Sequence, residues 1–298
     1  MSDAPHHPIP SLVGVNAVAH HAAPELAVVI PTFNESGNVH EMVCRLDAVL
    51  QGIQWEAIFV DDDSPDGTSA KVREVAQNDP RVRCIRRVGR RGLSSACVEG
   101  MLATSAPWVA VIDADMQHDE SKLPQMLQML RDGNYDIIVG TRYAEGGGMQ
   151  GWQEDRQKIS RAATDMSQRL LNLKLSDPMS GFFMLRRDSL EACVYKLSNM
   201  GFKILVDILV SSPKPLRIGE VGYQFRNRTA GESKLDNRVA WDFLMLLIDK
   251  TIGRWVPTRF VSFGMIGGVG VLVHLTALRA LIGLGGLAFF RAQVGAVI

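Results

Sequence analysis

Two carboxylates separated by one residue, Asp113 and Asp115, follow a short apolar run in the segment VIDADMQH. Residues i and i+2 of an extended chain face the same side, so we expect both carboxylates on one face, with Gln117 continuing it. Hard oxygen ligands supplied sparsely suit Mg²⁺ or Mn²⁺, which keep positions open for water and phosphate oxygens. The motif therefore predicts a metal site that stabilises the charge of a departing diphosphate.

A second acidic cluster, VDDDSPDGT, places Asp61, Asp62 and Asp63 at the end of another apolar run. A fold tolerates such a concentration of negative charge only where something offsets it. Sugar hydroxyls, base N–H groups or a cation could do so. Pro65 and Gly67 are typical of a turn that starts a helix, whereas we interpret Asp61 and Asp63 as binding residues.

The segment IPTFNE supplies residues that suit a nucleoside. Pro31 and Phe33 can frame a flat base, and Glu35 can accept hydrogen bonds from ribose or base donors. The structural alternative is a turn with a helix cap at Asn34 or Ser36. The motif alone leaves both interpretations open.

Basic residues occur in two further motifs, Arg142 in GTRY and Arg228 with Lys234 in FRNRTAGESKL, and Arg156 lies between them. The arginine side chain presents a fork that matches phosphate geometry. A solvated surface role is the alternative for each of them. The placement of Arg142 and Arg228 after predicted strands favours anion binding for these two.

The elements that must position these residues follow an alternating pattern. Short apolar runs alternate with longer segments of helical period, which is typical of a sheet with crossover helices. The predicted strands are 27–30, 57–60, 82–86, 109–112 and 137–140, and the predicted helices are 38–50, 67–78, 94–105 and 122–131. Ligands of such sheets bind beyond the carboxyl ends of the strands, which is where the polar motifs fall.

The C-terminal part of the chain has a different character. A helix is predicted over 156–173 and a strand over 216–225. A helix that lies at a membrane interface is predicted over 239–252, with Lys250, Arg254 and Arg259 near the headgroups. These basic residues favour a catalytic domain on the cytoplasmic face.

Residues 260–278 carry no formal charge apart from a titratable histidine, and the length fits a transmembrane helix. A buried helix of a soluble protein is the alternative. Residues 287–298 form an apolar stretch that is too short to cross a membrane as a helix.

Composition excludes several classes of protein. The chain has 298 residues, of which 46% are hydrophobic and 21% charged, and 32 basic residues balance 32 acidic ones. It is therefore globular, with no net field to attract nucleic acid. Residues 1–25 predict a disordered tail without a secretory signal. The four cysteines lack the spacing of a zinc site or a disulfide framework, and we interpret them as reduced core thiols.

Taken in order, the motifs resemble those of glycosyltransferase family 2, and within it the polyprenol-phosphate sugar transferases of the dolichol-phosphate mannosyltransferase type. The motifs are PTFNE, VDDDSPDGT, DADMQH, GTRY, DPMSGFF, GFK and FRNRTAGESKL. The resemblance implies an α/β fold of the GT-A type, the nucleotide-diphospho-sugar transferase fold, with a mixed, mostly parallel sheet and flanking helices over 26–235. An interfacial helix over 236–258 and a C-terminal transmembrane helix follow, and 259–298 resembles the start of a GtrA-like membrane domain.

The resemblance also implies roles for particular residues. Those implied to contact the nucleotide sugar are Pro31, Phe33, Glu35, Asp61, Asp63, Asp113, Ala114, Asp115, Arg228 and Lys234. Those implied to hold Mg²⁺ or Mn²⁺ are Asp113, Asp115 and Gln117, and those implied to bind the acceptor phosphate are Arg142 and Arg156. Asp115 and Arg228 are predicted to be catalytic.

Phe33 stands where the family commonly has Tyr, and Asp63 where it has Asn. The choice between guanine and uracil therefore stays open. The predicted reaction is an inverting, metal-dependent transfer of a sugar, mannose from GDP-mannose, to a polyprenyl or dolichyl phosphate at the cytoplasmic membrane face. The phosphate is already ionised, so no general base is required, and His118 is interpreted as structural.

Three alternatives remain. The first is a polyprenyl-phosphate transferase that uses UDP-glucose or another nucleotide sugar. The second is a family 2 enzyme that acts on a sugar hydroxyl, for which a QxxRW-like segment is absent from the sequence. The third is a non-catalytic, membrane-anchored protein that binds a nucleotide sugar.

Overall fold

The computed structural model describes residues 23–144, 147–149, 175–198, 203–226 and 258–283, together with Phe289 and Gln293. Several predictions lie outside these residues. They are the tail over 1–22, the helices over 156–173 and 239–252, and most of the stretch 287–298.

A seven-stranded sheet forms the centre of the N-terminal part, in the order β3-β2-β1-β4-β7-β5-β8. The strands are β1 (Leu26–Thr32), β2 (Trp55–Asp61), β3 (Val82–Arg86), β4 (Trp108–Val111), β5 (Ile137–Thr141), β7 (Phe183–Arg186) and β8 (Ile218–Gly222). β7 runs antiparallel to both of its neighbours, β4 and β5, and the other pairings are parallel. The sheet is therefore mixed and mostly parallel, as predicted.

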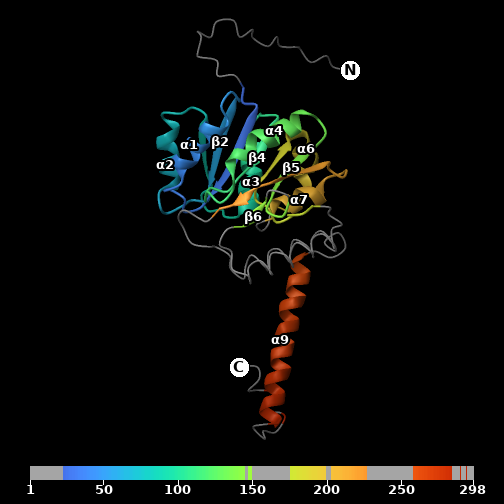
Figure 1. Cartoon of the computed structure of the whole chain (residues 1–298). Helices are drawn as coiled ribbons and strands as arrows, with labels where there is room; N and C mark the ends of the chain where they lie inside the picture. The colour runs from blue at the N-terminus through green and yellow to red at the C-terminus, as the bar shows by residue number, and fades with distance from the viewer. Residues whose placement is uncertain are drawn as a thin grey trace, which may run out of the picture.

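Helices cover both faces of this sheet (Figure 1). The helices are α1 (Val39–Val49), α2 (Thr68–Ala76), α3 (Leu93–Leu102), α4 (Leu123–Arg131), α6 (Arg187–Cys193) and α7 (Ile204–Ser211), with short 3₁₀ turns η1 (Glu120–Lys122) and η2 (Val194–Lys196). The predicted helices match α1 to α4 within a few residues at each end.

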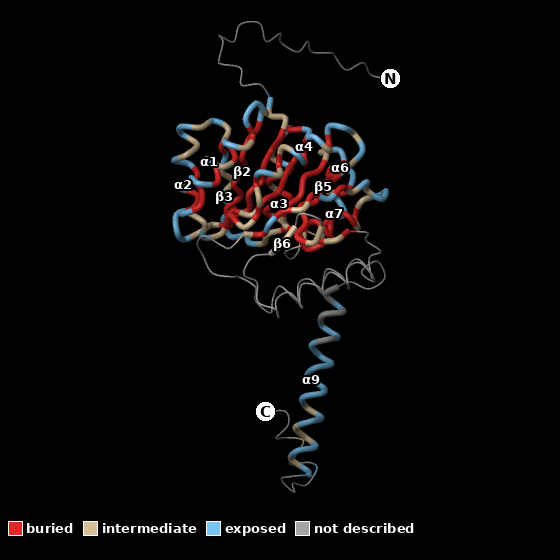
Figure 2. Tube along the Cα trace, in the orientation of Figure 1, coloured by how far each residue is buried: buried red, intermediate tan, exposed pale blue. Residues whose placement is uncertain are grey.

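The strands separate two apolar layers because their side chains alternate in direction. In β1, Leu26, Val28 and Ile30 pack in one cluster with residues of α1, α2 and α4, whereas Ala27 and Val29 pack in the other with residues of α3, α6 and α7. Figure 2 shows the strands as the buried centre of the domain. The result is a three-layer α/β/α sandwich.

Two strand predictions differ from the structure. No strand was predicted within DPMSGFFML, yet β7 lies there; its continuous apolar run, Phe183–Leu185, is buried on both faces of the sheet. The single strand predicted over 216–225 is two strands: β8 in the main sheet, and β9 (Gln224–Phe225), which pairs with β6 (Gly148–Met149). The break falls at Tyr223, whose ring turns into the apolar core.

The C-terminal helix, α9 (Thr258–Gly283), extends away from the sheet domain (Figures 1 and 2). Within the described residues, Ile266–Gly283 is the one helical segment long and apolar enough to cross a membrane, with a mean hydropathy of 1.7 and none of its residues buried. The sequence predicted an end at residue 278, before Arg279. The helix continues through Arg279, since one long basic side chain does not interrupt helical geometry.

The cysteine prediction is confirmed in one respect and wrong in another. All four cysteines are free. Cys97 and Cys193 are buried in the core and Cys84 is partly buried, but Cys44 is exposed on α1, with its Sγ 3.6 Å from Nδ1 of His40.

Candidate active site

Three residues just beyond the carboxyl ends of β1, β2 and β4 adopt left-handed backbone conformations. They are Asn34, Asp63 and Met116, with φ of 58°, 56° and 62°. Non-glycine residues rarely take this conformation, and such residues are frequent at ligand sites. All three follow the strands that carry the polar motifs, so the unusual backbone marks this edge of the sheet as the candidate site.

The loops after β1 and β2 are held together by side chains. The backbone amide of Asn34 donates to Ser64 Oγ at 2.9 Å, and those of Glu35 and Ser36 donate to Thr68 Oγ1 and Asp66 Oδ2, both at 3.0 Å. Although its partial burial opposes the shift, hydrogen bonds from Thr68 and Ser36 lower the pKa of Asp66. Asp66 is thus a charged anchor that fixes one loop against the other.

Asp61 is completely buried and is surrounded by hydroxyl groups of the chain itself. It accepts hydrogen bonds from Ser64 Oγ, Ser69 Oγ, the Ser64 backbone amide at 3.1 Å and Thr32 Oγ1 at 3.4 Å. Internal donors therefore offset its charge, where the sequence suggested ligand groups or a cation.

The next two carboxylates face Arg86, the last residue of β3, and Arg87, which follows it. Arg87, only 2% exposed, lies 2.7 Å from Asp62, whose second oxygen accepts the Gly92 amide at 2.7 Å. Burial raises the pKa of Asp62 in spite of these partners. Asp63 pairs with Arg86 at the protein surface, with Nε 2.7 Å from Oδ1. The pairing of Asp62 with Arg87 was not predicted, although the adjacent arginines in IRRVG were a visible signal.

The proposed base-binding residues line the same edge. Pro31 is buried within β1, opposite Val60 of β2. The guanidinium of Arg91 lies over the ring of Phe33, 4.5 Å from the ring centroid. Glu35 accepts a hydrogen bond from Asn38 Nδ2 at 2.8 Å. The alternative helix cap at Asn34 or Ser36 does not form, because α1 begins after Asn38.

The loop after β4 places its two carboxylates differently from the prediction. The chain turns at residues 114 and 115 instead of continuing extended, so the alternation that predicted a shared face does not apply. Asp113 is partly exposed, whereas Ala114 and Asp115 are buried. Asp115 Oδ1 accepts the Gln117 amide at 3.1 Å, which closes the turn.

Gln117 connects this loop to the end of β9. Its side chain donates to the Arg226 carbonyl at 3.1 Å, and its own carbonyl accepts the Arg226 amide at 2.9 Å. The side-chain carbonyl oxygen of Gln117 takes no hydrogen bond from any described residue. That oxygen is the kind of group that a hard cation binds.

His118 packs in the core, which agrees with its interpretation as a structural residue, and its Nε2 lies 3.8 Å from Asp113 Oδ2. It is buried, stacks on Phe182 at a centroid distance of 5.5 Å and meets Tyr223 and Phe225 edge-on at 5.7 Å each. Its Nδ1 accepts the Asp113 amide at 3.3 Å. The aromatic group of His118, Phe182, Tyr223 and Phe225 therefore supports the acidic loop from behind.

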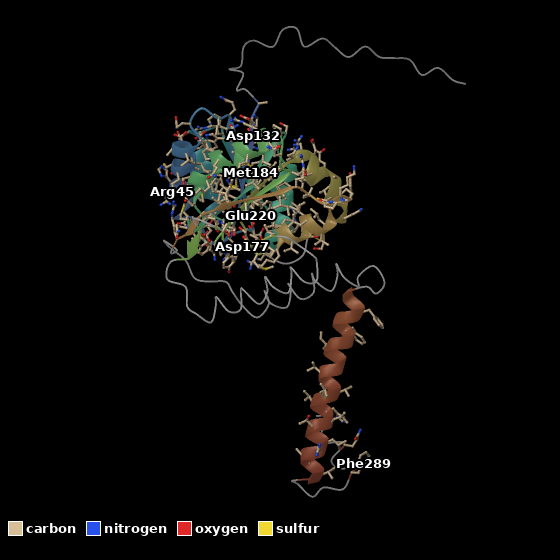
Figure 3. The ribbon with its side chains drawn as sticks, turned by 45° about the vertical axis from the view of Figure 1, so that its right-hand side comes forward. Arg45, Asp132, Asp177, Met184, Glu220 and Phe289 are labelled. Atoms are coloured by element: carbon tan, nitrogen blue, oxygen red, sulfur yellow. The ribbon has the colours of Figure 1, made fainter. Side chains whose placement is uncertain are left out.

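Arg142 forms a two-point ion pair with Asp177. Nε and Nη2 lie 2.7 and 2.8 Å from the two carboxylate oxygens, and both side chains are almost fully buried. Figure 3 shows Asp177 near the edge of the sheet domain that faces α9 and Asp132 at the opposite edge. The predicted phosphate-binding arginine thus directs two of its donors to a carboxylate of the chain, which makes it a buried, fixed positive group.

The donor chemistry of the β4 loop fits Mg²⁺ or Mn²⁺. In the part of the chain that the structure describes, no three His, Cys, Asp or Glu side chains gather as a metal-binding set. Asp113 and Asp115, with the Gln117 oxygen, supply a sparse set of oxygen ligands, and substrate phosphates complete such a shell in many magnesium sites. Gly181 lies close to Asp113: a Cβ added at Gly181 would lie 3.0 Å from Asp113 Oδ2.

Arg156, Arg228 and Lys234 lie outside the described residues, so their roles stay predictions. No role was predicted for Asp177, although its motif DPMSGFF was noted. None was predicted for Lys203 of GFK or for Tyr223, which lies in no motif.

Comparison with known proteins identifies the family. Residues 27–194 match the model of glycosyl transferase family 2. A dolichol-phosphate mannosyltransferase of Pyrococcus furiosus is 36% identical over 88% of this chain and 73% of its own length. The protein of the same name from Saccharomyces cerevisiae is 35% identical over 80% of this chain and 91% of its own length.

Solved structures share the fold. Glucosyl-3-phosphoglycerate synthase from Mycobacterium tuberculosis in complex with phosphoglyceric acid has a TM-score of 0.58 at 18% identity, covering 76% of this chain and 80% of that one. Its complex with Mn²⁺, uridine diphosphate and glucosyl-3-phosphoglycerate gives 0.57 at 17% identity, with the same coverage. The fold is accordingly of the GT-A type, and the chain belongs to glycosyl transferase family 2.

Proposed function

We propose that this glycosyltransferase moves mannose from GDP-mannose to a polyprenyl phosphate of the dolichyl type, with Mg²⁺ or Mn²⁺. The observation that carries the proposal is the position of Asp113 and Asp115 beyond β4, which lies in the sheet between β1 and β7. The loop that follows β1 carries the nucleotide-type residues, and the segment before β7 carries the partner of Arg142. Relatives named dolichol-phosphate mannosyltransferase support the choice of sugar and acceptor.

The acceptor needs no general base in this reaction. A phosphate oxygen, ionised near neutral pH, attacks the anomeric carbon, and the nucleoside diphosphate leaves from the opposite face with inversion. The burial of His118 against aromatic rings agrees with a mechanism that uses no histidine base. The metal, when bound, neutralises the charge that develops on the leaving diphosphate.

The residues of the chain hold the two substrates in line. Pro31, Phe33 and Glu35 bind the base and ribose, and Asp63 contacts the nucleotide from the rim. Asp61 acts from inside the protein by fixing the loop that carries these contacts, because its oxygens are bound to Ser64 and Ser69. Such positioning lowers the entropic barrier to the transfer step.

The remaining roles concern phosphate groups and complete the site as predicted from the sequence. Arg228 and Lys234 bind the donor diphosphate, and Arg156 lies by the acceptor. Arg142 acts as a fixed positive group whose orientation Asp177 sets.

We further propose that α9 spans the membrane, with the catalytic domain on the cytoplasmic face. Large apolar side chains such as Phe260, Phe263 and Leu272 are 66% to 74% exposed on this helix. Exposing such a long apolar surface to water is unfavourable, and large apolar patches normally mark a binding surface. The hydrocarbon of a bilayer would cover this one.

A panel of nucleotide sugars tests the reaction. Purified full-length chain in detergent is given GDP-mannose, GDP-glucose, UDP-glucose or UDP-galactose with a polyprenyl phosphate, with Mn²⁺ or with a chelator, and lipid-linked product is measured by mass spectrometry. The proposal requires metal-dependent mannosyl-lipid of inverted configuration from GDP-mannose. If only UDP-sugars gave product, the donor would be a UDP-sugar and not GDP-mannose. If the chain bound a nucleotide sugar but formed no product, it would be a nucleotide-sugar-binding protein and not a transferase.

A further inference from the structure

Arg226 follows the last residue of β9 and joins that strand to the acidic loop after β4. Its backbone amide donates to the Gln117 carbonyl at 2.9 Å, and its own carbonyl accepts a hydrogen bond from Gln117 Nε2 at 3.1 Å. The two residues are 109 positions apart in the sequence. A residue outside the predicted metal-binding set therefore contacts the side-chain amide of one of its members.

This contact determines the orientation of the Gln117 side-chain amide. Such an amide has an NH₂ end that donates and a carbonyl oxygen that accepts. The NH₂ end is bonded to the Arg226 carbonyl, so the carbonyl oxygen is the end that remains for a ligand. Mg²⁺ and Mn²⁺ prefer oxygen ligands, amide carbonyls among them. The Arg226 carbonyl thus favours the orientation in which Gln117 can bind a metal.

The guanidinium of Arg226 forms ion pairs with the same loop. Nη2 lies 2.8 Å from Asp119 Oδ1, and Nη1 lies 2.9 Å from Glu120 Oε2. The side chains of Asp119 and Glu120 are only 15% and 10% exposed. An isolated surface ion pair contributes little, but an arginine that bridges two largely buried carboxylates forms a network of fixed geometry. These ion pairs therefore hold residue 226 against the acidic loop.

The loop itself is anchored on its other side by α1. Arg45 of α1 lies 3.6 Å from Glu120 Oε1, so Glu120 is held between two arginines. β9, by contrast, has two residues and pairs with the two-residue β6. A two-stranded pair of this size is marginal without further contacts. Since charge-assisted contacts are roughly twice as strong as neutral hydrogen bonds, the ion pairs are the strongest contacts of Arg226 among the described residues.

We propose that Arg226 is a positioning residue for the divalent metal. Its ion pairs with Asp119 and Glu120 hold its carbonyl at the place where that carbonyl orients the Gln117 side chain. The inference rests on the proposed function, in which Gln117 is a metal ligand, and adds a residue that acts through Gln117. Loss of a group that orients a metal ligand typically weakens metal binding by roughly 10- to 100-fold, whereas loss of a purely structural ion pair would leave metal affinity unchanged.

Metal binding without turnover tests this role. Mn²⁺ is titrated into the full-length chain in detergent, with GDP or, separately, with UDP, and without acceptor, and its Kd is measured by calorimetry. Arg226→Met removes the charge, and Arg226→Lys keeps a charge that cannot reproduce the two-point geometry. The matched control is Arg217→Met, because Arg217 also forms a two-point ion pair, with Asp136, at the amino ends of β8 and β5. Thermal unfolding monitors the fold of each variant.

Mn²⁺ binding should weaken by about tenfold or more in Arg226→Met, by less in Arg226→Lys, and not at all in Arg217→Met. In the transfer assay, the apparent KM for Mn²⁺ should rise in Arg226→Met by a similar factor. Its kcat at saturating Mn²⁺ should stay near the parental value, because the metal ligands themselves are intact.

A folded Arg226→Met chain with parental Mn²⁺ affinity would overturn this inference and leave the proposed function intact. A parent chain that binds no Mn²⁺ with either nucleotide would overturn the proposed metal site and this inference together. If Arg226→Met does not fold, Arg226→Gln is measured in its place by the same criterion. Loss of the fold in both variants would make Arg226 a residue of the fold, which also contradicts the proposal.

Discussion

The acidic residues after β2 and those after β4 look alike in the sequence and differ in the structure. At the end of β2, groups of the chain itself engage all three carboxylates: Asp61 accepts hydrogen bonds from hydroxyls, Asp62 pairs with buried Arg87 and Asp63 pairs with Arg86. After β4, Asp113 is partly exposed and its carboxylate lies close to Gly181. Asp61 and Asp62 hold the loops together, and the second cluster contains the proposed metal ligands.

This difference teaches that a run of acids at a strand end does not by itself indicate ligand binding. Charge must be offset in either case. Hydroxyl groups offset the charge of Asp61, and Arg87 and Arg86 at the end of β3 offset those of Asp62 and Asp63. The mutations below separate a carboxylate that stabilises the fold from one that acts on the substrate.

The largest effect should come from Asp115→Ala. Removing a proposed metal ligand should lower kcat by on the order of a thousandfold, since electrostatic stabilisation of a developing charge is worth this much. The temperature of unfolding should stay close to that of the parent. Full activity in a folded variant would remove the metal assignment from this loop.

Arg87→Met should mainly affect stability. It leaves buried Asp62 without its counterion, which costs about 3–5 kcal/mol of the free energy of unfolding. Arg86→Met is the matched control, because the Arg86–Asp63 pair lies at the surface and should cost at most about 1 kcal/mol. Urea denaturation of both variants measures the difference, and equal losses would contradict the distinction between the two pairs.

The loss of unfolding free energy in Arg87→Met should depend on pH. The pKa of Asp62 is raised in the folded protein, chiefly by burial, so the fold binds its proton more tightly than the unfolded chain does. Stability from this group is therefore present at low pH and falls as the pH rises through the folded pKa. The loss in Arg87→Met should be smaller at about pH 4 than at about pH 7, whereas Arg86→Met should change little.

A smaller effect is expected for Gly181→Ala. The added Cβ would lie 3.0 Å from Asp113 Oδ2, so the carboxylate must move by a few tenths of an ångström. Activity should fall by about tenfold because the site depends on precise positions, while thermal unfolding changes little. Gly37→Ala is the control, since its Cβ would meet no atom within 4 Å. Equal activities of the two variants would show that Asp113 tolerates displacement.

The smallest effect concerns Arg91→Met. The Arg91 guanidinium stacks over Phe33 at the protein surface, and an exposed cation–π contact contributes about 0.5–1 kcal/mol. The Kd for GDP should rise by about threefold, with the fold unchanged. An unaltered Kd for GDP would contradict the proposed contact of Phe33 with the nucleotide.

Much of the frame followed from the sequence because local patterns specify it. Each strand from β1 to β5 has its own apolar run, and each helix from α1 to α4 has its own helical period. The turn residues that end these elements are adjacent to them in the sequence, so a short window contains the whole signal. β7 could not be predicted in the same way, because its place between β4 and β5 depends on residues that lie far away in the sequence.

The geometry of the candidate site differs from the prediction. The strand-end motifs do fall at one edge of the sheet, but the turn at Asp115 and the left-handed Met116 broke the assumed alternation. The Arg142–Asp177 pair and the contacts of Arg226 with the acidic loop are contacts between distant segments, and no local spacing encodes them.

The antiparallel strand β7 also has a consequence for biosynthesis. β4 and β5 have no direct pairing with one another, since each pairs with β7 in the register Val111 to Phe183 and Val139 to Phe183. A nascent polypeptide can assemble β1 to β4 early, whereas β5 waits until residue 186 has left the ribosome. During that interval the β4 edge is open to mispairing, and the long sequence separation slows closure. Translation speed over this stretch should therefore govern the yield of native enzyme.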